Sequence, residues 1–388
     1  MFSHTLPKIA LPATLFVNNK RLLLPFLLLC CLAYPPIRDI TLASMSDAFF
    51  QVSVFVAATL FIYYYAIDRL PQLELGYLSQ KSPLLEVSFA SFLGALPGCG
   101  GAIIVVTQFT KGQASFGSVV AVLTATMGDA AFLLLATKPI EGLLIMAIGL
   151  SVGVISGSLV NAFHDKDYLR PEKNDFCDDC LNSPSRAIIF SKSVWQIILI
   201  PSVIIAVLIA LNTDFNAINN TLADLITVFG AVMALLAVTT WALSSKGQSY
   251  QEITSEEETI NPPSKLYKVL QDTHFVTAWV VASFMLFELL VTFAGVDLKA
   301  WFTHYAYLAP LIAVAIGFLP GCGPQIVVTT LYIQGIIPFS ALAANAISND
   351  GDALFPAIAM APRAALVATA YSAIPAMFVG YGLYFYGV

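Results

Sequence analysis

Long apolar runs, separated by short polar stretches, repeat along the whole chain. Eleven of them are long enough to predict membrane helices, because about 20 apolar residues cross about 30 Å of hydrocarbon. They lie at 22–37, 48–68, 83–110, 114–136, 140–162, 192–211, 221–243, 273–295, 303–333, 338–360 and 364–386. Longer polar segments at 163–191 and 244–272 interrupt the series. The pattern predicts an all-α polytopic membrane protein with about 9–11 membrane segments.

The composition supports this prediction. Of the 388 residues, 58% are hydrophobic and 11% are charged, whereas soluble domains average about 25% charged residues. The net charge of −6 provides no basic surface for nucleic acid, which is therefore not an expected partner. The first apolar run, 22–37, lacks a small-residue cleavage site, so we expect a retained span in contact with the lipid bilayer.

Two unusual segments read GALPGCGGAIIVV at 94–106 and GFLPGCGPQIVVT at 317–329. A shift of 223 residues aligns 94–139 with 317–362 without a gap, and 18 of the 46 positions are identical. The identities fall on uncommon residues, including the pairs Pro97/Pro320, Cys99/Cys322, Thr107/Thr330, Gly128/Gly351 and Asp129/Asp352. The sequence therefore contains a duplication.

The distribution of Lys and Arg indicates how the chain is oriented, because cytoplasmic loops hold the excess. If all eleven runs cross, the two sides hold 8 and 10 of the 18 basic residues. If 83–110 and 303–333 are re-entrant hairpins, the split becomes 15 to 3. If only 83–110 re-enters and 303–333 crosses, the split is 14 to 4. The prediction of a second hairpin therefore depends on its sequence similarity to the first. We expect the N-terminus and the 163–191 loop to be cytoplasmic.

The hairpin topology predicts two inverted repeats, each with a broken or re-entrant LPGCG helical hairpin. The expected divisions are a first repeat at 1–162, a cytoplasmic loop and connector span at 163–220, and a second repeat at 221–388. Inverted repeats whose broken helices meet near the midplane are typical of secondary transporters. A channel is the second class. An enzyme is not expected, because H-E-x-x-H, G-x-S-x-G and P-loop motifs are absent from the sequence.

The LPGCG segments predict helix breaks at membrane depth. Proline removes a backbone donor and glycine relaxes the backbone, and the freed groups are tolerated only where they line a polar cavity. The helix that restarts after each break attracts anions to its amides, whereas the freed carbonyls attract cations. The break residues predicted to bind the substrate or an ion are Pro97, Gly98, Cys99, Gly100, Pro320, Gly321, Cys322 and Gly323.

A second duplicated motif carries acids, in TATMGDAAF at 124–132 and ISNDGDALF at 347–355. Asp129 and Asp352 are expected inside apolar helices, where an ionised carboxylate costs about 2.5–3.5 kcal/mol. We expect each to bind a cation, carry a proton, or do both in turn. Other polar residues near the breaks are included in the predicted site, namely Thr107, Gln325, Thr330, Asn349 and Asp350.

The two thiols and two carboxylates favour a transition or soft metal, since thiolates select such ions. The predicted ligands of a transported metal are Cys99, Asp129, Cys322 and Asp352. The same residues are compatible with a sodium- or proton-coupled transporter of a small organic or inorganic anion held at the helix N-termini. No tightly bound cofactor is expected beyond the transported or coupling cation, which would be Mn²⁺ or another metal, Na⁺ or H⁺.

Cys177 and Cys180 form a C-x-x-C pair in the long polar loop. A structural Zn²⁺ site needs four ligands, so His164 or a second protomer of a homodimer would have to complete one. The predicted cytoplasmic position argues against a permanent disulfide.

The chain resembles the bacterial family of ten-transmembrane heavy-metal exporters, also labelled manganese transporters. The resemblance covers most of the chain and is carried by LPGCGG at 96–101, LPGCGP at 319–324, MGDA at 127–130, DGDA at 350–353 and the C-x-x-C loop. It implies efflux of a metal ion across the bacterial inner membrane. Nine spans plus two hairpins depart from the nominal ten.

Overall fold

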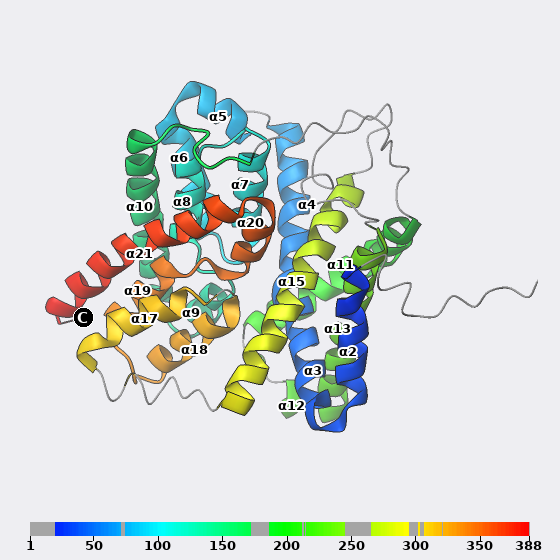
Figure 1. Cartoon of the computed structure of the whole chain (residues 1–388). Coiled ribbons are helices and arrows are strands. Elements are labelled where there is room, and N and C mark those ends of the chain that lie inside the picture. The colour runs from blue at the N-terminus through cyan, green and yellow to red at the C-terminus, as the bar shows by residue number, and fades with distance from the viewer. Residues whose placement is uncertain are drawn as a thin grey trace, which may run out of the picture.

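The computed structural model describes residues 20–70, 74–171, 186–211, 213, 215–244, 265–294, 302, 306–319 and 321–387. These residues form helices joined by short turns, and the helices gather into two groups that lie side by side in Figure 1. We call them the flanking bundle and the repeat bundle.

The flanking bundle contains helices from the start, the middle and the later part of the chain. They are η1 (Lys20–Leu22), α2 (Leu23–Ala33), α3 (Pro35–Asp47), the π-helical η2 (Ala48–Ser53), α4 (Val54–Arg69), α11 (Arg186–Ala210), α12 (Phe215–Ile218), α13 (Asn220–Ser244) and α15 (Lys265–Ala294).

The repeat bundle contains both duplicated segments, so each bundle combines helices from both predicted halves of the chain. From the first half come α5 (Leu75–Lys81), α6 (Pro83–Ala95), α7 (Gly100–Thr110), α8 (Phe116–Ala125), α9 (Ala130–Thr137) and α10 (Pro139–Phe163). From the second half come η4 (Ala306–Leu308), α17 (Ala309–Gly317), α18 (Cys322–Ile333), α19 (Phe339–Ser348), η5 (Gly351–Ala353), α20 (Leu354–Met360) and α21 (Pro362–Phe385).

Within the described residues, seven helical segments are long and apolar enough to cross a membrane. They are Pro35–Ile67, Phe116–Thr137, Pro139–Phe163, Ala187–Ala210, Asn220–Ser244, Leu266–Leu286 and Pro362–Phe385. The remaining predicted spans are divided into shorter helices, such as α6 with 13 residues and α7 with 11. An 11-residue helix is about 17 Å long, which is too short to cross the hydrocarbon alone.

The prediction of a membrane span at 22–37 is wrong. The apolar run is divided at Tyr34, where α2 ends and α3 begins. The physical reason is the pair Pro35 and Pro36: prolines lack the amide that would continue α2, but they fit the first turn of a new helix. The long helix that follows starts at Pro35 and passes through η2 into α4.

Asp129 and Asp352, which were expected inside apolar helices, lie instead next to a break in each helical run. A break separates α8 from α9, and another separates α19 from α20. Asp129 is the residue before α9, and Asp352 lies in η5. Gly128 and Gly351 adopt left-handed φ angles of 53° and 57°, which cannot continue a right-handed α-helix.

The duplication recurs in the boundaries of the elements. α8 begins at Phe116 and α19 at Phe339, while α10 begins at Pro139 and α21 at Pro362, and each pair is separated by the shift of the sequence repeat. Glycines with positive φ also occur in equivalent pairs, which are Gly98/Gly321, Gly112/Gly335 and Gly128/Gly351. The repeat therefore specifies the same succession of helices and breaks twice.

The turn after α10 is hydrogen-bonded to the end of α7 and to α5. The Arg170 guanidinium donates to the carbonyl oxygens of Phe109 and Ala114 at 3.0 and 2.8 Å. The Lys166 ammonium donates to the carbonyl of Ser79, on the helix before α6, at 3.3 Å. Figure 1 has α6 and α7 in the upper part of the repeat bundle, and α17 and α18 in the lower part.

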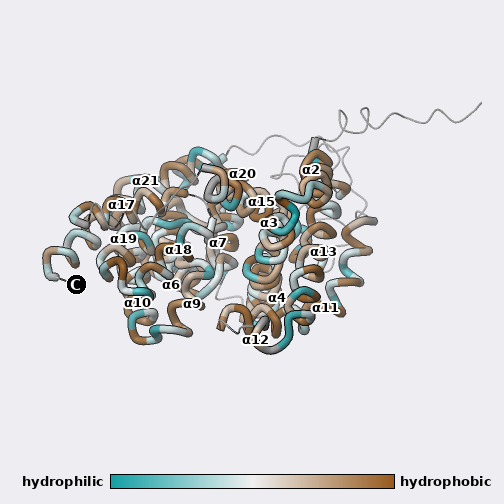
Figure 2. Tube along the Cα trace, turned by 90° about the horizontal axis from the view of Figure 1, so that it is seen from below, coloured by the Kyte–Doolittle hydropathy of each residue, from teal (hydrophilic) through white to brown (hydrophobic). Residues whose placement is uncertain are grey.

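The outer helices expose apolar side chains. Ile140 on α10 and Ile197 on α11 are each 78% exposed, and Leu225 on α13 is also exposed. Figure 2 shows hydrophobic segments on these helices at the outside of the molecule. Because water does not favour such surfaces, they are suited to lipid.

Candidate functional site

The helix breaks of each half are joined to one another. The amide of Gly98 donates to the carbonyl of Gly128 at 3.1 Å, and the amide of Gly321 donates to the carbonyl of Gly351 at 3.3 Å. Each LPGCG break is thus fixed against the glycine–aspartate break of its own half. The same bond occurs twice because the duplicated segments supply the same donor and acceptor.

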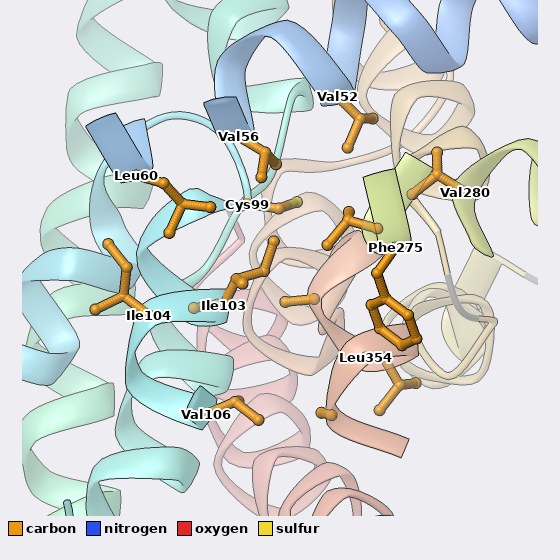
Figure 3. Packing of buried hydrophobic residues seen from close by; sticks show 14 of the residues in the cluster. Val52, Val56, Leu60, Cys99, Ile103, Ile104, Val106, Phe275, Val280 and Leu354 are labelled. Carbon is orange, nitrogen blue, oxygen red and sulfur yellow. The ribbon is translucent and has the colours of Figure 1, made fainter. Parts of the chain in front are cut away.

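The two breaks bring Cys99 and Cys322 together. Their sulfur atoms are 3.6 Å apart, although the residues are 223 positions apart in sequence. Cys99 precedes α7 and is 2% exposed, while Cys322 opens α18 and is fully buried. Neither forms a disulfide in the described structure. Figure 3 shows Cys99 among buried apolar side chains, with Val56 of α4 and Ile103 of α7 nearby. Both cysteines therefore lie where the LPGCG segments interrupt the helices.

Gly128 and Gly351 approach the thiol pair closely. A Cβ atom on Gly128 would lie 2.8 Å from the Cys322 sulfur and 3.4 Å from the Cys99 sulfur. A Cβ atom on Gly351 would lie 3.1 Å from the Cys99 sulfur and 3.7 Å from the Cys322 sulfur. The two glycine backbones therefore pack closely against the sulfur atoms, and a side chain at either position would crowd them.

Asp129 lies beside the break and faces a cleft. Its side chain is 8% exposed, and its Oδ1 atom is 3.9 Å from the position of a Cβ on Gly98. The cleft has a volume of about 430 Å³ and lies between η2, α4 and α11 of the flanking bundle and α9 and α18 of the repeat bundle. It is lined by Gln51, Phe55, Asp129, Phe132, Leu133, Thr137, Ala206, Ile209, Ala210, Ile326, Thr330, Ile333 and Gln334.

Two stacked aromatic rings line this cleft beside the break. The rings of Phe55 and Phe132 have centroids 4.6 Å apart and planes inclined by 24°. Both rings' side chains come within 3.9 Å of the position of a Cβ on Gly98, the residue before Cys99. Phe132 is duplicated as Phe355, whose ring stacks on Trp279 of α15 at 6.3 Å. Each half thus presents one phenylalanine to an aromatic ring of the flanking bundle.

The duplicated threonines have different surroundings. Thr330 on α18 lines the cleft, together with Thr137 at the end of α9. The equivalent residues of the opposite halves are Thr107 and Met360, and there the Thr107 hydroxyl donates to the Met360 sulfur at 4.0 Å. The region around Thr330 and Thr137 is therefore open, whereas the equivalent region around Thr107 and Met360 is packed together.

The extra polar residues of the second half form a separate buried group. Asp350 is buried, and one of its carboxylate oxygens accepts a hydrogen bond from the Thr369 hydroxyl on α21. Asn345 donates through its side chain to the Ala313 carbonyl at 2.9 Å. Asn349, the residue before Asp350, is also buried. These contacts tie the second glycine–aspartate break to α17 and α21.

The glycines and prolines of the breaks also shape the packing. Gly100 opens α7, and a Cβ there would lie 2.6 Å from the Cβ of Thr59 on α4, so the glycine permits close approach of the two bundles. Pro97 lies in the break before α7, and Gly323 lies in the first turn of α18. Gly321 has a φ of 113°, which only glycine adopts readily.

Several predicted residues lie outside what the structure describes. These are Pro320, Cys177 and Cys180, and the side chain of Asp352. His164, suggested as a partner of the C-x-x-C pair, bonds through Nε2 to the Tyr371 hydroxyl at 2.8 Å. In the described part of the chain, His, Cys, Asp and Glu side chains do not gather in groups of three or more that could hold a metal. The metal site at these residues therefore stays a prediction.

The residues of the flanking bundle that line the cleft were not predicted from the sequence. Gln51 and Phe55 come from the apolar run 48–68, which is not part of the aligned repeat. A signal existed for Gln51, which is an isolated amide within that run. Phe132 was also overlooked, although its identity with Phe355 in the alignment marks it as part of the duplicated motif.

Comparison with known proteins connects this geometry to a family. A family model described as "Putative, 10TM heavy-metal exporter" matches residues 36–387, which include the LPGCG breaks, the glycine–aspartate breaks and the whole cleft. No curated protein and no solved structure matches the chain. The described structure agrees with a multi-pass membrane transporter, because apolar helices suited to crossing a bilayer surround a buried pair of thiols and a cleft. The chain belongs to the family of 10TM heavy-metal exporters.

Proposed function

We propose that the protein is a secondary active transporter that exports a divalent transition or heavy-metal ion, and that Cys99 and Cys322 bind this ion as thiolates. The observation that carries the proposal is the distance of 3.6 Å between the two sulfur atoms. Two thiolates that share one tetrahedral metal ion, each at about 2.3 Å, lie about 3.8 Å apart. The spacing of the pair therefore already suits two ligands of one ion.

Charge and burial support an ion with two positive charges. A divalent ion and two thiolates form a neutral complex, which a buried apolar site tolerates far better than a net charge. The amides at the starts of α7 and α18 meet at the same place and favour negative thiolates there. Thiols release protons when they bind a metal. Exchange of the metal ion for protons is therefore the coupling that we favour over sodium.

The proposed topology is an inverted repeat with two re-entrant hairpins near the midplane of a bacterial inner membrane. It is supported by the short helices on either side of each LPGCG break, and by the contacts of Arg170 with the end of α7 and of Lys166 with α5, the helix before α6. The opposite positions of the two hairpins in Figure 1 also support it. Broken helices of this kind commonly line the substrate site of secondary transporters.

The difference between the two equivalent regions supports alternating access. The cleft near Asp129 and Thr330 is open, whereas Thr107 and Met360 are in contact at the equivalent place. The open cleft extends toward the end of α9, next to Lys138, which is one of the three basic residues predicted to lie outside. We infer an outward-open state, and the opposite state would exchange the two arrangements.

We propose that Asp129 and Asp352 assist the two thiols and do not replace them as ligands of the metal ion. Asp129 faces the cleft, so it would attract the ion or its exchanged protons between the cleft and the thiol pair. Asp352 is its equivalent in the duplicated motif and would serve the opposite side. In this role each carboxylate is needed for flux but not for binding of a metal by the two thiols.

Transport by purified protein in proteoliposomes tests the proposal. With a pH gradient imposed and Zn²⁺, Cd²⁺ or Mn²⁺ on one side, we expect the wild type to move a metal ion against protons. Cys99→Ser and Cys322→Ser should each lower the rate by about tenfold or more, because each removes one of two charged ligands. Asp129→Asn and Asp352→Asn should each abolish flux while the protein remains folded.

Cys31→Ser is the matched control, because Cys31 is also a free thiol but lies on α2 of the flanking bundle, away from the breaks. It should transport at the wild-type rate. Wild-type metal flux in both Cys99→Ser and Cys322→Ser would overturn thiolate binding. Wild-type flux in both aspartate variants would mean that the carboxylates are structural.

One observation favours a second candidate, the transport of a small anion. The starts of α7 and α18, which carry partial positive charge, converge on the thiol pair. In that case the same proteoliposomes would accumulate an anion that depends on Na⁺ or protons, and the two serine variants would retain flux. The spacing of the thiols and the family description give the metal ion precedence.

A further inference from the structure

A third donor side chain points to the same place as the two thiols. Gln325 lies on the first turn of α18, three residues after Cys322, and is 1% exposed. Within the described structure, neither its Oε1 nor its Nε2 atom has a hydrogen-bond partner. Leaving a buried polar group unpaired costs about 1–3 kcal/mol, and native proteins rarely accept this without a reason. A bound ligand is such a reason.

The amide oxygen of Gln325 lies close to Gly128 of the first half. The place that a Cβ on Gly128 would occupy is 2.8 Å from the Cys322 sulfur, 3.4 Å from the Cys99 sulfur and 3.5 Å from Oε1 of Gln325. One sulfur from each half and one amide oxygen therefore converge beside Gly128. A side chain at Gly128 would collide with the nearer sulfur.

The amide oxygen has no counterpart in the first half. The shift of the repeat aligns Gln325 with Ala102, a buried residue whose methyl group offers no donor atom. The donor set is thus two sulfur atoms, which bind as thiolates, and one neutral oxygen. It carries two negative charges and balances one divalent ion without any carboxylate.

We propose that Cys99, Cys322 and Gln325 form a three-ligand seat beside Gly128 for a divalent d¹⁰ ion such as Zn²⁺ or Cd²⁺, which it prefers to Mn²⁺. The proposal rests on the transport function given above and specifies its substrate. Zn²⁺ and its relatives accept thiolates and a low coordination number. Mn²⁺ is weaker in the series of divalent metals and suits oxygen ligands in octahedral sites. The seat offers only one oxygen, so it discriminates against Mn²⁺.

Binding of Cd²⁺ to the purified full-length chain in detergent tests the seat. Thiolate ligation of cadmium gives an ultraviolet charge-transfer absorption, which reports the thiols directly and does not depend on transport. We expect one Cd²⁺ per chain in the wild type, with Mn²⁺ in large excess unable to displace it. Gln325→Ala, which copies the first half, should weaken Cd²⁺ binding by about tenfold with the absorption retained, which corresponds to about 1.4 kcal/mol.

Two further variants make the test specific. Gln325→Glu keeps an oxygen at the same place and should bind Cd²⁺ at least as tightly as the wild type. Gln108→Ala removes another buried glutamine, on α7 and outside the cleft lining, and it should leave the affinity unchanged. Thermal unfolding of each variant without metal verifies that the fold is retained.

The outcomes separate this proposal from the proposed function. If Gln325→Ala binds Cd²⁺ within about twofold of the wild type, Gln325 is not a ligand, although the thiol pair stands. If Mn²⁺ displaces Cd²⁺ at comparable concentration, the proposed preference for Cd²⁺ over Mn²⁺ is wrong. If the wild type gives no thiolate absorption with Cd²⁺, the thiol pair itself does not bind the metal, and the proposed function fails as well.

Discussion

At the scale of single residues, the site depends on glycines, which lack a side chain, as much as on the side chains that are present. Gly128 and Gly351 adopt left-handed backbone angles and place only hydrogen atoms against the two sulfur atoms. Each glycine therefore has two roles, one in ending a helix and one in leaving room at the thiols. A substitution tests both roles at once unless the strain is measured separately.

Gly128→Ala should abolish Cd²⁺ binding and metal transport. The new methyl group would lie 2.8 Å from the Cys322 sulfur, closer than van der Waals contact, and would fill the space between the thiols. Cd²⁺ titration and proteoliposome flux are the measurements. The left-handed angle adds a strain of about 1 kcal/mol, which thermal unfolding would reveal.

Gly335→Ala is the matched control for this variant. Gly335 also has a positive φ, of 73°, but a Cβ there would have no heavy atom within 4 Å. It should show a similar loss of stability with Cd²⁺ binding unchanged. Equal Cd²⁺ affinities in Gly128→Ala and the wild type would contradict the space-filling argument.

The residue-scale prediction from sequence succeeded where the duplication marked the residue. Cys99 and Cys322 were predicted to meet because identical motifs in a repeat suggest one shared site, and their contact is observed. Gln51 and Phe55 carry no such mark, because they come from a helix outside the aligned repeat. Their approach to Asp129 depends on how the two bundles pack, and this packing is not encoded in any local pattern.

At the scale of elements, the breaks in the middle of apolar runs decide where the chemistry lies. Hydropathy predicted one span at 114–136, because the residues around Gly128 are apolar enough to hide a break. The structure divides this run into α8 and α9. Glycine alone is a weak signal for such a break, since helices tolerate isolated glycines at a cost of about 1 kcal/mol. The breaks at LPGCG were predictable, because proline cannot continue a helix.

The stacked rings of Phe55 and Phe132 join α4 to α9, so their contact should control access to the thiols. Phe55→Ala removes a contact of about 0.5–1.5 kcal/mol and leaves an opening beside Gly98. We expect a charged, membrane-impermeant thiol reagent to modify Cys99 and Cys322 several-fold faster than in the wild type. Mass spectrometry of the modified peptides measures the rate.

Phe92→Ala is the matched control for Phe55→Ala. Phe92 also stacks on another ring, that of Phe89 on the same helix, with planes inclined by 24°, but neither residue lines the cleft. The modification rate should stay at the wild-type value. An unchanged rate in Phe55→Ala would mean that the stacked rings do not limit access.

At the scale of the whole molecule, two bundles meet around one site. A hydrogen bond of 2.7 Å between the hydroxyls of Ser53 and Thr277 joins η2 to α15 within the flanking bundle, so this bundle is tied across both halves of the chain. The repeat bundle is tied by the contact of Cys99 with Cys322. Positive-inside counting could predict the sides of the membrane, but it could not predict that helices of the two halves would mix in both bundles.

Alternating access predicts that the closed region opens during transport. Thr107→Cys with Met360→Cys places two thiols where the native side chains are in contact, and a short bifunctional thiol reagent should join them. We expect joined protein to lose metal flux, because α7 and α20 can no longer separate. Cleavage of a reducible reagent should restore the flux, which proteoliposomes would report.

The equivalent pair in the open cleft is the control for this crosslink. Thr137→Cys with Thr330→Cys should react poorly with the same short reagent, since both residues line the open cleft, whereas Thr107 and Met360 are in contact. Efficient joining of both pairs under the same conditions would contradict a state that is open on one side only. Full flux in the joined Thr107 and Met360 variant would show that this region does not move.

The alignment of Gln325 with Ala102 bears on the history of the molecule. Both cysteines occupy the same place in the duplicated segments. In the proposed inverted topology, a half-length ancestor that paired with an inverted copy of itself would therefore already have possessed the two thiols. It would not have possessed a single amide beside them, because every residue of such a pair occurs twice. Joining two copies into one chain would have allowed the halves to become unequal, and in the proposed site that inequality is what distinguishes one metal from another.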